Sequence, residues 1–201
     1  IFVGILNRDQ NHLKFNKYDA ITGAFVKTLF EEKAATWVEP QHTLTFVPNN
    51  PNQFIYQSDF NGYNQMYLYT TDGKLLKNLG FKDVVVTNLL GFDGTNTKIN
   101  YIGTANNGLD RQLYQVDIKS GKTIQLTTIS GTHNASVSSD GMLVLDQYSN
   151  ATTPNEISIL NILNTKNILN TYYKTTPEGT INTIHNIALG TTPNFTFRVS
   201  F

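Results

Sequence analysis

The sequence predicts an all-β fold, a β-propeller built from four-stranded antiparallel blades. Turns that combine Gly with Lys or Ala recur at Thr22-Gly23-Ala24, Asp72-Gly73-Lys74 and Ser120-Gly121-Lys122, with a weaker echo at Asn164-Thr165-Lys166. Their spacings of about 50, 48 and 44 residues fall in the range of propeller blades. Aromatic and β-branched residues fill short runs between these turns, and Gly, Pro, Asn and Asp fill the gaps. No amphipathic helix of about 10 or more residues is evident.

Each unit repeats the same order of strands. The first unit has only the second, third and fourth strands of a blade, at 1–7, 13–18 and 25–30. The second unit is complete, with strands at 43–47, 53–58, 65–69 and 75–79. The third has strands at 86–92, 98–103, 112–118 and 123–128, and the fourth at 134–138, 142–148, 156–162 and 167–173. We therefore expect residues 1–173 to form blades, the first of them incomplete.

A propeller protects its strand edges by closing a ring, and four blades is the lower end of the usual range. Two arrangements follow: four blades that close on themselves, or half of a larger ring. The missing first strand and the absence of an initiator Met favour a piece of a longer protein. Residues 174–201 are expected to form terminal strands or a connection to a further domain.

Composition excludes several classes of function. Lys and Arg total 15, as do Asp and Glu, so the chain has no electrostatic footprint for nucleic acid. There is no cysteine, which excludes disulfides, thiolate zinc sites and cysteine nucleophiles. No apolar run approaches the roughly 18 residues of a membrane-spanning helix. We expect no cofactor, no nucleic-acid partner and no membrane span.

Several segments are similar, in order and in register, to a known family. They are 6–11, 26–32, Trp37-Val38-Glu39-Pro40, 54–58, 62–69, 86–93, 111–114 and 133–141. Together they resemble the N-terminal β-propeller of the dipeptidyl peptidase IV family, especially its Bacteroidetes-type members. The resemblance extends to about Asn150 and weakens beyond it, and 175–201 does not match the family's crossing into its next domain.

The resemblance implies an eight-bladed propeller, of which this chain would be the second half, fused to an α/β-hydrolase domain. Such enzymes are serine peptidases that release dipeptides from peptide N-termini, preferring Pro or Ala in second position. It further implies a peptide substrate, a hydrolase domain in the same parent protein, homodimer contacts and a periplasmic or extracytoplasmic location. The family's glutamate pair for the substrate amine lies in an earlier blade, and Glu31-Glu32 does not match it.

The sequence contains few candidates for functional residues. In the family, the loop that matches Trp37, Val38 and Glu39 borders the substrate cleft, so these three are candidates for a cleft rim. The competing interpretation is that Trp37 packs between blades, as aromatic residues commonly do. Arg111 is a candidate for a salt bridge across a blade or for an interface contact. No catalytic residue is assigned, because the G-x-S-x-G elbow of a hydrolase serine is absent.

Other charged groups receive structural interpretations. Glu31 and Glu32 point to opposite faces of a strand and are expected at a solvated strand end. The sequences Asp93-Gly94-Thr95-Asn96 and Asp140-Gly141 lack the alternating ligands of a calcium loop and predict turns. His12, His42, His133 and His185 are too widely separated to predict a metal site.

Two functions from different classes remain. The first is the propeller portion of a dipeptidyl peptidase IV-like serine exopeptidase, which gates and supports a catalytic domain but carries no triad in this chain. The alternative is a non-catalytic propeller that binds peptide or protein. A carbohydrate-binding propeller has little support, because Trp37 is the only tryptophan available to stack on a sugar ring.

Overall fold

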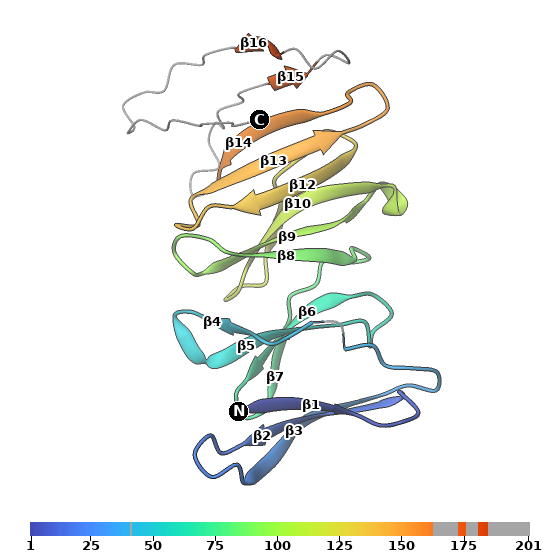
Figure 1. Cartoon of the computed structure of the whole chain (residues 1–201), viewed down its shortest axis with the longest axis vertical. Helices are drawn as coiled ribbons and strands as arrows, with labels where there is room; N and C mark the ends of the chain where they lie inside the picture. Colours follow the sequence, from blue (N-terminus) through green and yellow to red (C-terminus); the bar gives the residue numbers. More distant parts are fainter. Residues whose placement is uncertain (41, 163–172, 176–180, 185–201) are drawn as a thin grey trace.

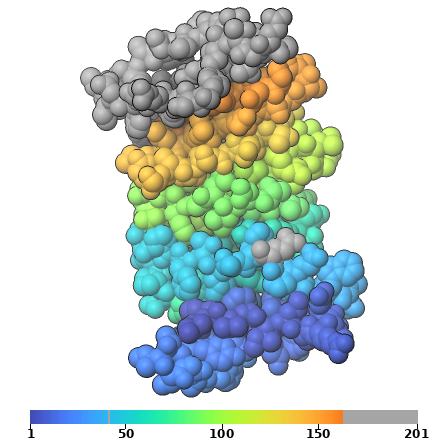
Figure 2. Space-filling view, viewed as in Figure 1, coloured from blue at the N-terminus to red at the C-terminus, as the bar shows by residue number. Residues whose placement is uncertain are grey.

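The computed structural model describes residues 1–40, 42–162, 173–175 and 181–184, and these form an all-β structure. Helical backbone is limited, among these residues, to a 3-10 turn at Asn106–Gly108. The strands form four consecutive sheets that stack along the long axis of the molecule, followed by a short pair, β15 (Tyr173–Thr175) and β16 (Ile181–Ile184) (Figure 1). In the space-filling view the sheets appear as successive bands that follow the order of the chain (Figure 2).

The first and second sheets differ by one strand. The first contains β1 (Phe2–Leu6), β2 (His12–Tyr18) and β3 (Phe25–Lys33) in the order of the sequence. The second contains β4 (Thr45–Val47), β5 (Asn50–Ser58), β6 (Gln65–Thr70) and β7 (Leu75–Asn78), again in order and antiparallel. This is the predicted pattern of a blade lacking its first strand followed by a complete blade.

The third sheet contains β8 (Val86–Phe92), β9 (Lys98–Ala105), β10 (Asp110–Asp117) and β11 (Thr123–Gln125). The fourth contains β12 (Thr132–Val137), β13 (Leu143–Ser149) and β14 (Glu156–Asn161). A single parallel pairing of Arg111 with Thr132 joins the two sheets. The predicted strand at 167–173 lies outside the described residues except for Tyr173.

Apolar side chains fill the space between successive sheets because the central strands are apolar on both faces. Phe54 and Tyr56 of β5 face the first sheet, where they pack with Leu13 and Phe15. The intervening Ile55 faces the third sheet and packs there with a separate cluster. A smaller cluster joins the third and fourth sheets, with members including Ile102, Leu113, Val144 and Leu160. The second and third sheets therefore contribute both faces to the core, one to each neighbouring sheet, as successive propeller blades do.

The turn between β6 and β7 also docks onto the preceding sheet. The backbone of Gly73 lies against that of Leu29, at the point where β3 bulges between its pairings of Thr28 and Phe30. The neighbouring Asp72 carboxylate forms ion pairs with Lys17, at 3.6 Å, and Lys27, at 3.9 Å. The turn chemistry that the sequence predicts thus also fixes how one sheet sits on the next.

The fold class predicted from the sequence is confirmed as all-β, with consecutive antiparallel sheets that have three or four described strands each. Asp93 and Asp140 also behave as predicted. The Asp93 carboxylate accepts hydrogen bonds from the backbone of Thr97 and Lys98, and that of Asp140 accepts one from the backbone of Met142. Both are turn-forming side chains.

Candidate functional site

The loop that follows β3 carries the three residues predicted as a cleft rim. Val38 is 8% exposed and packs in the cluster between the first two sheets, whereas Trp37 is 64% exposed. Trp37 therefore does not pack between blades, and that competing interpretation is wrong. Glu39 is also exposed. Burial of the central residue turns the aromatic ring on one side and the carboxylate on the other toward solvent.

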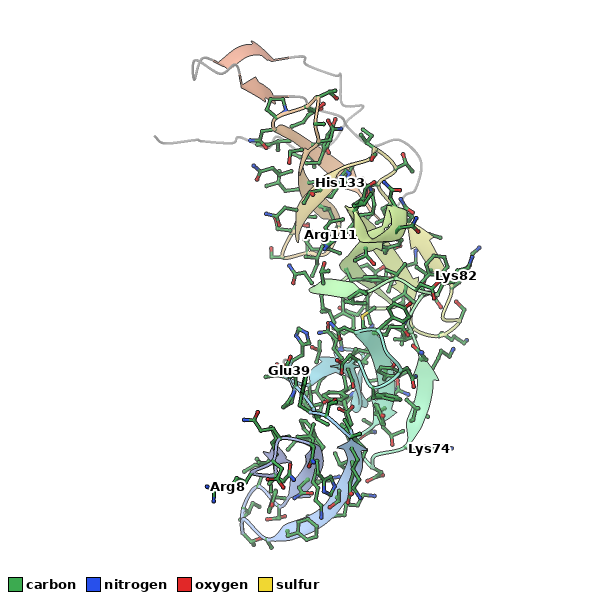
Figure 3. The ribbon with its side chains drawn as sticks, turned by 90° about the vertical axis from the view of Figure 1, so that its right-hand side faces the viewer. Arg8, Glu39, Lys74, Lys82, Arg111 and His133 are labelled. Atoms are coloured by element: carbon green, nitrogen blue, oxygen red, sulfur yellow. The ribbon has the colours of Figure 1, made fainter. Side chains whose placement is uncertain are left out.

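A rigid turn holds this loop in place. The Asn7 Oδ1 atom accepts hydrogen bonds from the backbone N–H groups of Asn11, at 3.0 Å, and His12, at 2.9 Å. Within the turn, Gln10 has a φ of 56°, and its carbonyl accepts a hydrogen bond of 2.7 Å from the N–H of Val38. The N–H of Ala34 donates to the carbonyl of Asn11 at 3.0 Å, so the loop is fixed on both sides of Trp37. In Figure 3, Arg8 of this turn and Glu39 lie on the same side of the stack, opposite Lys74.

The two adjacent glutamates of β3 lie on opposite faces, as predicted, but only Glu31 is at a solvated strand end. Glu31 pairs on the surface with His12, at 2.8 Å, and with Lys33, at 3.2 Å. Glu32 instead faces the second sheet, where the hydroxyl of Tyr56 donates to its Oε2 atom at 3.5 Å. Its Oε1 atom is buried without a hydrogen-bond partner among the described residues. The prediction of a solvated end is therefore wrong for Glu32.

The surroundings of Glu32 raise the pKa of its carboxyl. Burial raises the pKa of the Glu32 carboxyl, the negative charge of Asp59 adds to this effect, and the nearby hydroxyls of Ser58 and Tyr56 only partly oppose it. Burial raises the pKa of Tyr69 to about 12, with a further contribution from Glu32. A carboxyl in this position favours its neutral form more than an exposed one does.

Arg111 lies at the start of β10, and its guanidinium binds main-chain oxygens. The Nη1 atom donates to the carbonyls of Gly108, at 2.8 Å, and Asp110, at 2.9 Å. The ion pairs found in the described part of the chain do not include Arg111. Its contacts stabilise the tight turn that precedes β10, and the predicted interface role stays a prediction.

Sequence reasoning missed a buried pair in the fourth sheet. His133 of β12 and Asp146 of β13 have side chains that are each 2% exposed, with 2.7 Å between Nδ1 and Oδ2. The signal for it is the alternation of β12, which places His133 on the same face as the apolar Ala135 and Val137. No group of three or more His, Asp or Glu side chains suited to a metal ion occurs in the described residues. Nor is any helix there long and apolar enough to cross a membrane.

Comparisons with known proteins agree on one family. The family model of the dipeptidyl peptidase IV N-terminal region matches residues 1–155. A solved structure assigned as a dipeptidyl aminopeptidase IV from Bacteroides ovatus ATCC 8483 is 29% identical over 82% of this chain, with a TM-score of 0.74. Porphyromonas gingivalis dipeptidyl peptidase 4 is 25% identical over 82% of the chain, with a TM-score of 0.70. The matches span 26% and 23% of those two chains, respectively.

Proposed function

Because the chain belongs to the dipeptidyl peptidase IV N-terminal region family, we propose that it is a propeller portion of a serine exopeptidase that releases Xaa-Pro and Xaa-Ala dipeptides. The family match over residues 1–155 carries this proposal. In the parent protein, residues 1–173 form blades of a larger ring, and 174–201 lead toward an α/β-hydrolase domain. We further propose a location outside the cytoplasm and homodimer contacts for the parent protein, both supported by the family membership.

Within this enzyme the chain acts as a scaffold and a substrate gate. Trp37 supports the gating role because it offers a large, exposed ring on a loop whose backbone is fixed by Gln10 and Asn11. Because the loop backbone is already fixed, the ring loses little conformational entropy when it contacts a peptide substrate. Exposed aromatic residues are common at binding surfaces. Glu39, next to the buried Val38, adds a carboxylate on the same loop.

The chemistry of the parent enzyme is acyl transfer to a serine. A histidine serves as general base, and an oxyanion hole stabilises the negative charge that develops on the substrate carbonyl. These groups belong to the hydrolase domain in this proposal. The propeller contributes by admitting the N-terminal end of a peptide, which Trp37 contacts beyond the dipeptide, and by keeping folded chains away from the serine.

The intact mass and the activity of the native protein from its source test the assignment. We expect a mass several-fold above 22.5 kDa and hydrolysis of glycyl-prolyl p-nitroanilide that a serine-directed fluorophosphonate abolishes. A mass near 22.5 kDa without hydrolysis would contradict the peptidase assignment and would support a non-catalytic peptide-binding propeller.

The gating role has a separate test in the active native protein. We expect Trp37→Ala to raise the KM for peptides of six or more residues about 2- to 13-fold, since a lost aromatic contact is worth about 0.5–1.5 kcal/mol. The kcat/KM for the dipeptide amide should not change. The matched control is Ile21→Ala, because Ile21 is 95% exposed and lies in the turn at the other end of β2. Equal effects of the two substitutions would exclude a specific role for Trp37.

A further inference from the structure

The buried pair of His133 and Asp146 lies at the seam between the third and fourth sheets. The Nδ1 atom of His133 is 2.7 Å from the Asp146 carboxylate, and its Nε2 atom is 2.9 Å from the carbonyl oxygen of Ile129. A carbonyl oxygen can only accept, so Nε2 carries a proton. The short contact at Nδ1 needs a second proton between the ring and the carboxylate. The pair therefore satisfies both contacts only when it holds two protons.

Ile129 connects this pair to the neighbouring sheet. Its carbonyl oxygen also accepts a hydrogen bond of 2.7 Å from the Nε2 atom of Gln112, in β10 of the third sheet. One main-chain oxygen thus joins a side chain of the third sheet to a side chain of the fourth. The adjacent Gly131 carbonyl accepts the N–H of Arg111, at 3.0 Å, where the two sheets pair. These contacts hold the later part of the segment 126–131, which crosses between the sheets.

The charged and titratable groups around His133 come from several strands. Asp146 of β13 is in contact, and Asp110 of β10 lies close enough to act on the ring electrostatically. Tyr148 of β13 stacks on the ring with centroids 5.1 Å apart, and its hydroxyl donates to the carboxylate of Glu156 in β14. The Arg111 guanidinium is held by carbonyls of its own turn. Negative charge therefore predominates near the imidazole.

The surroundings of His133 shift its pKa in opposite directions. Burial by itself lowers the pKa of His133, but the bonds to Asp146 and to the Ile129 carbonyl outweigh it, and the net pKa is raised above the ordinary value of 6.5. A histidine whose pKa is raised on folding stabilises the folded state fully at low pH. That contribution decreases as the pH rises from about 6.5 and is lost above the folded-state pKa.

The seam between the second and third sheets is also bridged by side chains that donate to main-chain carbonyls, but here both donors are amides and each has its own carbonyl. The Nε2 atom of Gln65, at the start of β6, donates to the carbonyl of Lys82 at 2.7 Å, as Gln112 does to Ile129. The amide of Asn64 donates to the carbonyl of Val86 at 2.7 Å, in place of an imidazole. Because these amides keep their protons at all accessible pH values, this seam provides an internal control.

We propose that the His133–Asp146 pair is a pH-sensitive latch that holds the third and fourth sheets together and releases the segment 126–131 when the pair loses a proton. A neutral imidazole has one proton for these two contacts, and the carboxylate of Asp146 holds it on Nδ1. The bare Nε2 atom then faces the carbonyl oxygen of Ile129, and the two lone pairs repel. The seam with Gln65 and Asn64 does not respond.

Hydrogen exchange of the 201-residue chain, measured by mass spectrometry between about pH 5 and pH 9, tests the latch. After correction for intrinsic exchange rates, we expect protection in 126–137 to fall by up to about tenfold per pH unit above about pH 6.5, and then to level off. Protection in 79–86 should stay constant. Parallel pH profiles for the two segments in the wild-type chain would overturn the proposal.

Two substitutions sharpen the test. His133→Gln removes the titrating ring, and Asp146→Asn removes the charge that holds its second proton. Both should lower protection in 126–137 at acid pH and remove its pH dependence. A pH dependence like that of the wild type in either variant would overturn the latch. Should both variants fail to fold, as circular dichroism would show, the wild-type comparison of the two seams still decides.

Discussion

Replacing Gly73 by alanine should loosen the packing of the second sheet on the first. Gly73 has a φ of +86°, and a Cβ atom there would lie 2.7 Å from the Cα of Leu29 and closer still to its carbonyl oxygen. Two costs therefore add. The left-handed backbone costs an alanine about 1–2 kcal/mol, and forcing an extra carbon against packed backbone costs about 1–3 kcal/mol more. We expect a total loss of about 2–5 kcal/mol in the free energy of unfolding.

Gly23 provides a matched control for this substitution. It occupies the corresponding turn of the first sheet with a φ of +70°, but an added Cβ would have nothing within 4 Å. Gly23→Ala should therefore show only the backbone cost, about 1–2 kcal/mol. The difference between the two variants, about 1–3 kcal/mol, isolates the docking of the turn onto Leu29. Urea-induced unfolding followed by circular dichroism measures both values.

Equal losses for the two alanine variants would refute the reasoning. In that case the turn of the second sheet would not contact β3 in solution, and the stacking of the sheets would depend on their apolar side chains alone. A loss for Gly73→Ala that exceeds the loss for Gly23→Ala supports the close approach of the two backbones.

Three further predictions concern other parts of the structure, and urea unfolding tests all of them. Glu32→Gln should stabilise the chain near neutral pH and reduce the fall in stability with rising pH. A carboxyl with a raised pKa stabilises the folded state at low pH and loses that effect as it ionises. An unchanged dependence of stability on pH would contradict the burial of Glu32. Val38→Ala should lower the free energy of unfolding by about 1.5–3 kcal/mol, whereas Trp37→Ala should change it by no more than about 0.5 kcal/mol, since only Val38 is buried. The reverse order would mean that Trp37 packs in the core. Gln65→Ala should cost about 1–3 kcal/mol by leaving the Lys82 carbonyl without its donor, and a neutral result would show that water replaces the amide.

The fold was largely accessible from the sequence because its signals are local. Alternation of apolar residues sets which strands form, and Asp-Gly pairs such as Asp72-Gly73 set where they turn. The first sheet was correctly expected to have three strands, since 1–7 aligns with the second strands of later units. The single parallel pairing of Arg111 with Thr132 was not expected, because it depends on how closely two sheets approach rather than on any local pattern.

The candidate rim was found only through the family resemblance. Nothing in the composition of Trp37-Val38-Glu39 distinguishes a rim from a core segment, and the core interpretation of Trp37 was plausible until its exposure was known. The rigid support from Asn7 and Gln10 was also beyond the sequence, because it joins two loops separated by two strands.

The sequence by itself determined the class of fold, the strands, the turns and the family, because each depends on residues close together in the chain or on their order along it. The tertiary structure decided which polar groups are buried. Alternation placed Glu31 and Glu32 on opposite faces, but only the packing of the second sheet determined that Glu32 is the one withdrawn from water. In the same way, His133 and Asp146 lie on adjacent strands of one hairpin, and the packing of the fourth sheet against the third withdraws this pair from water. Burial is a property of the whole stack, since water is excluded only where two faces meet.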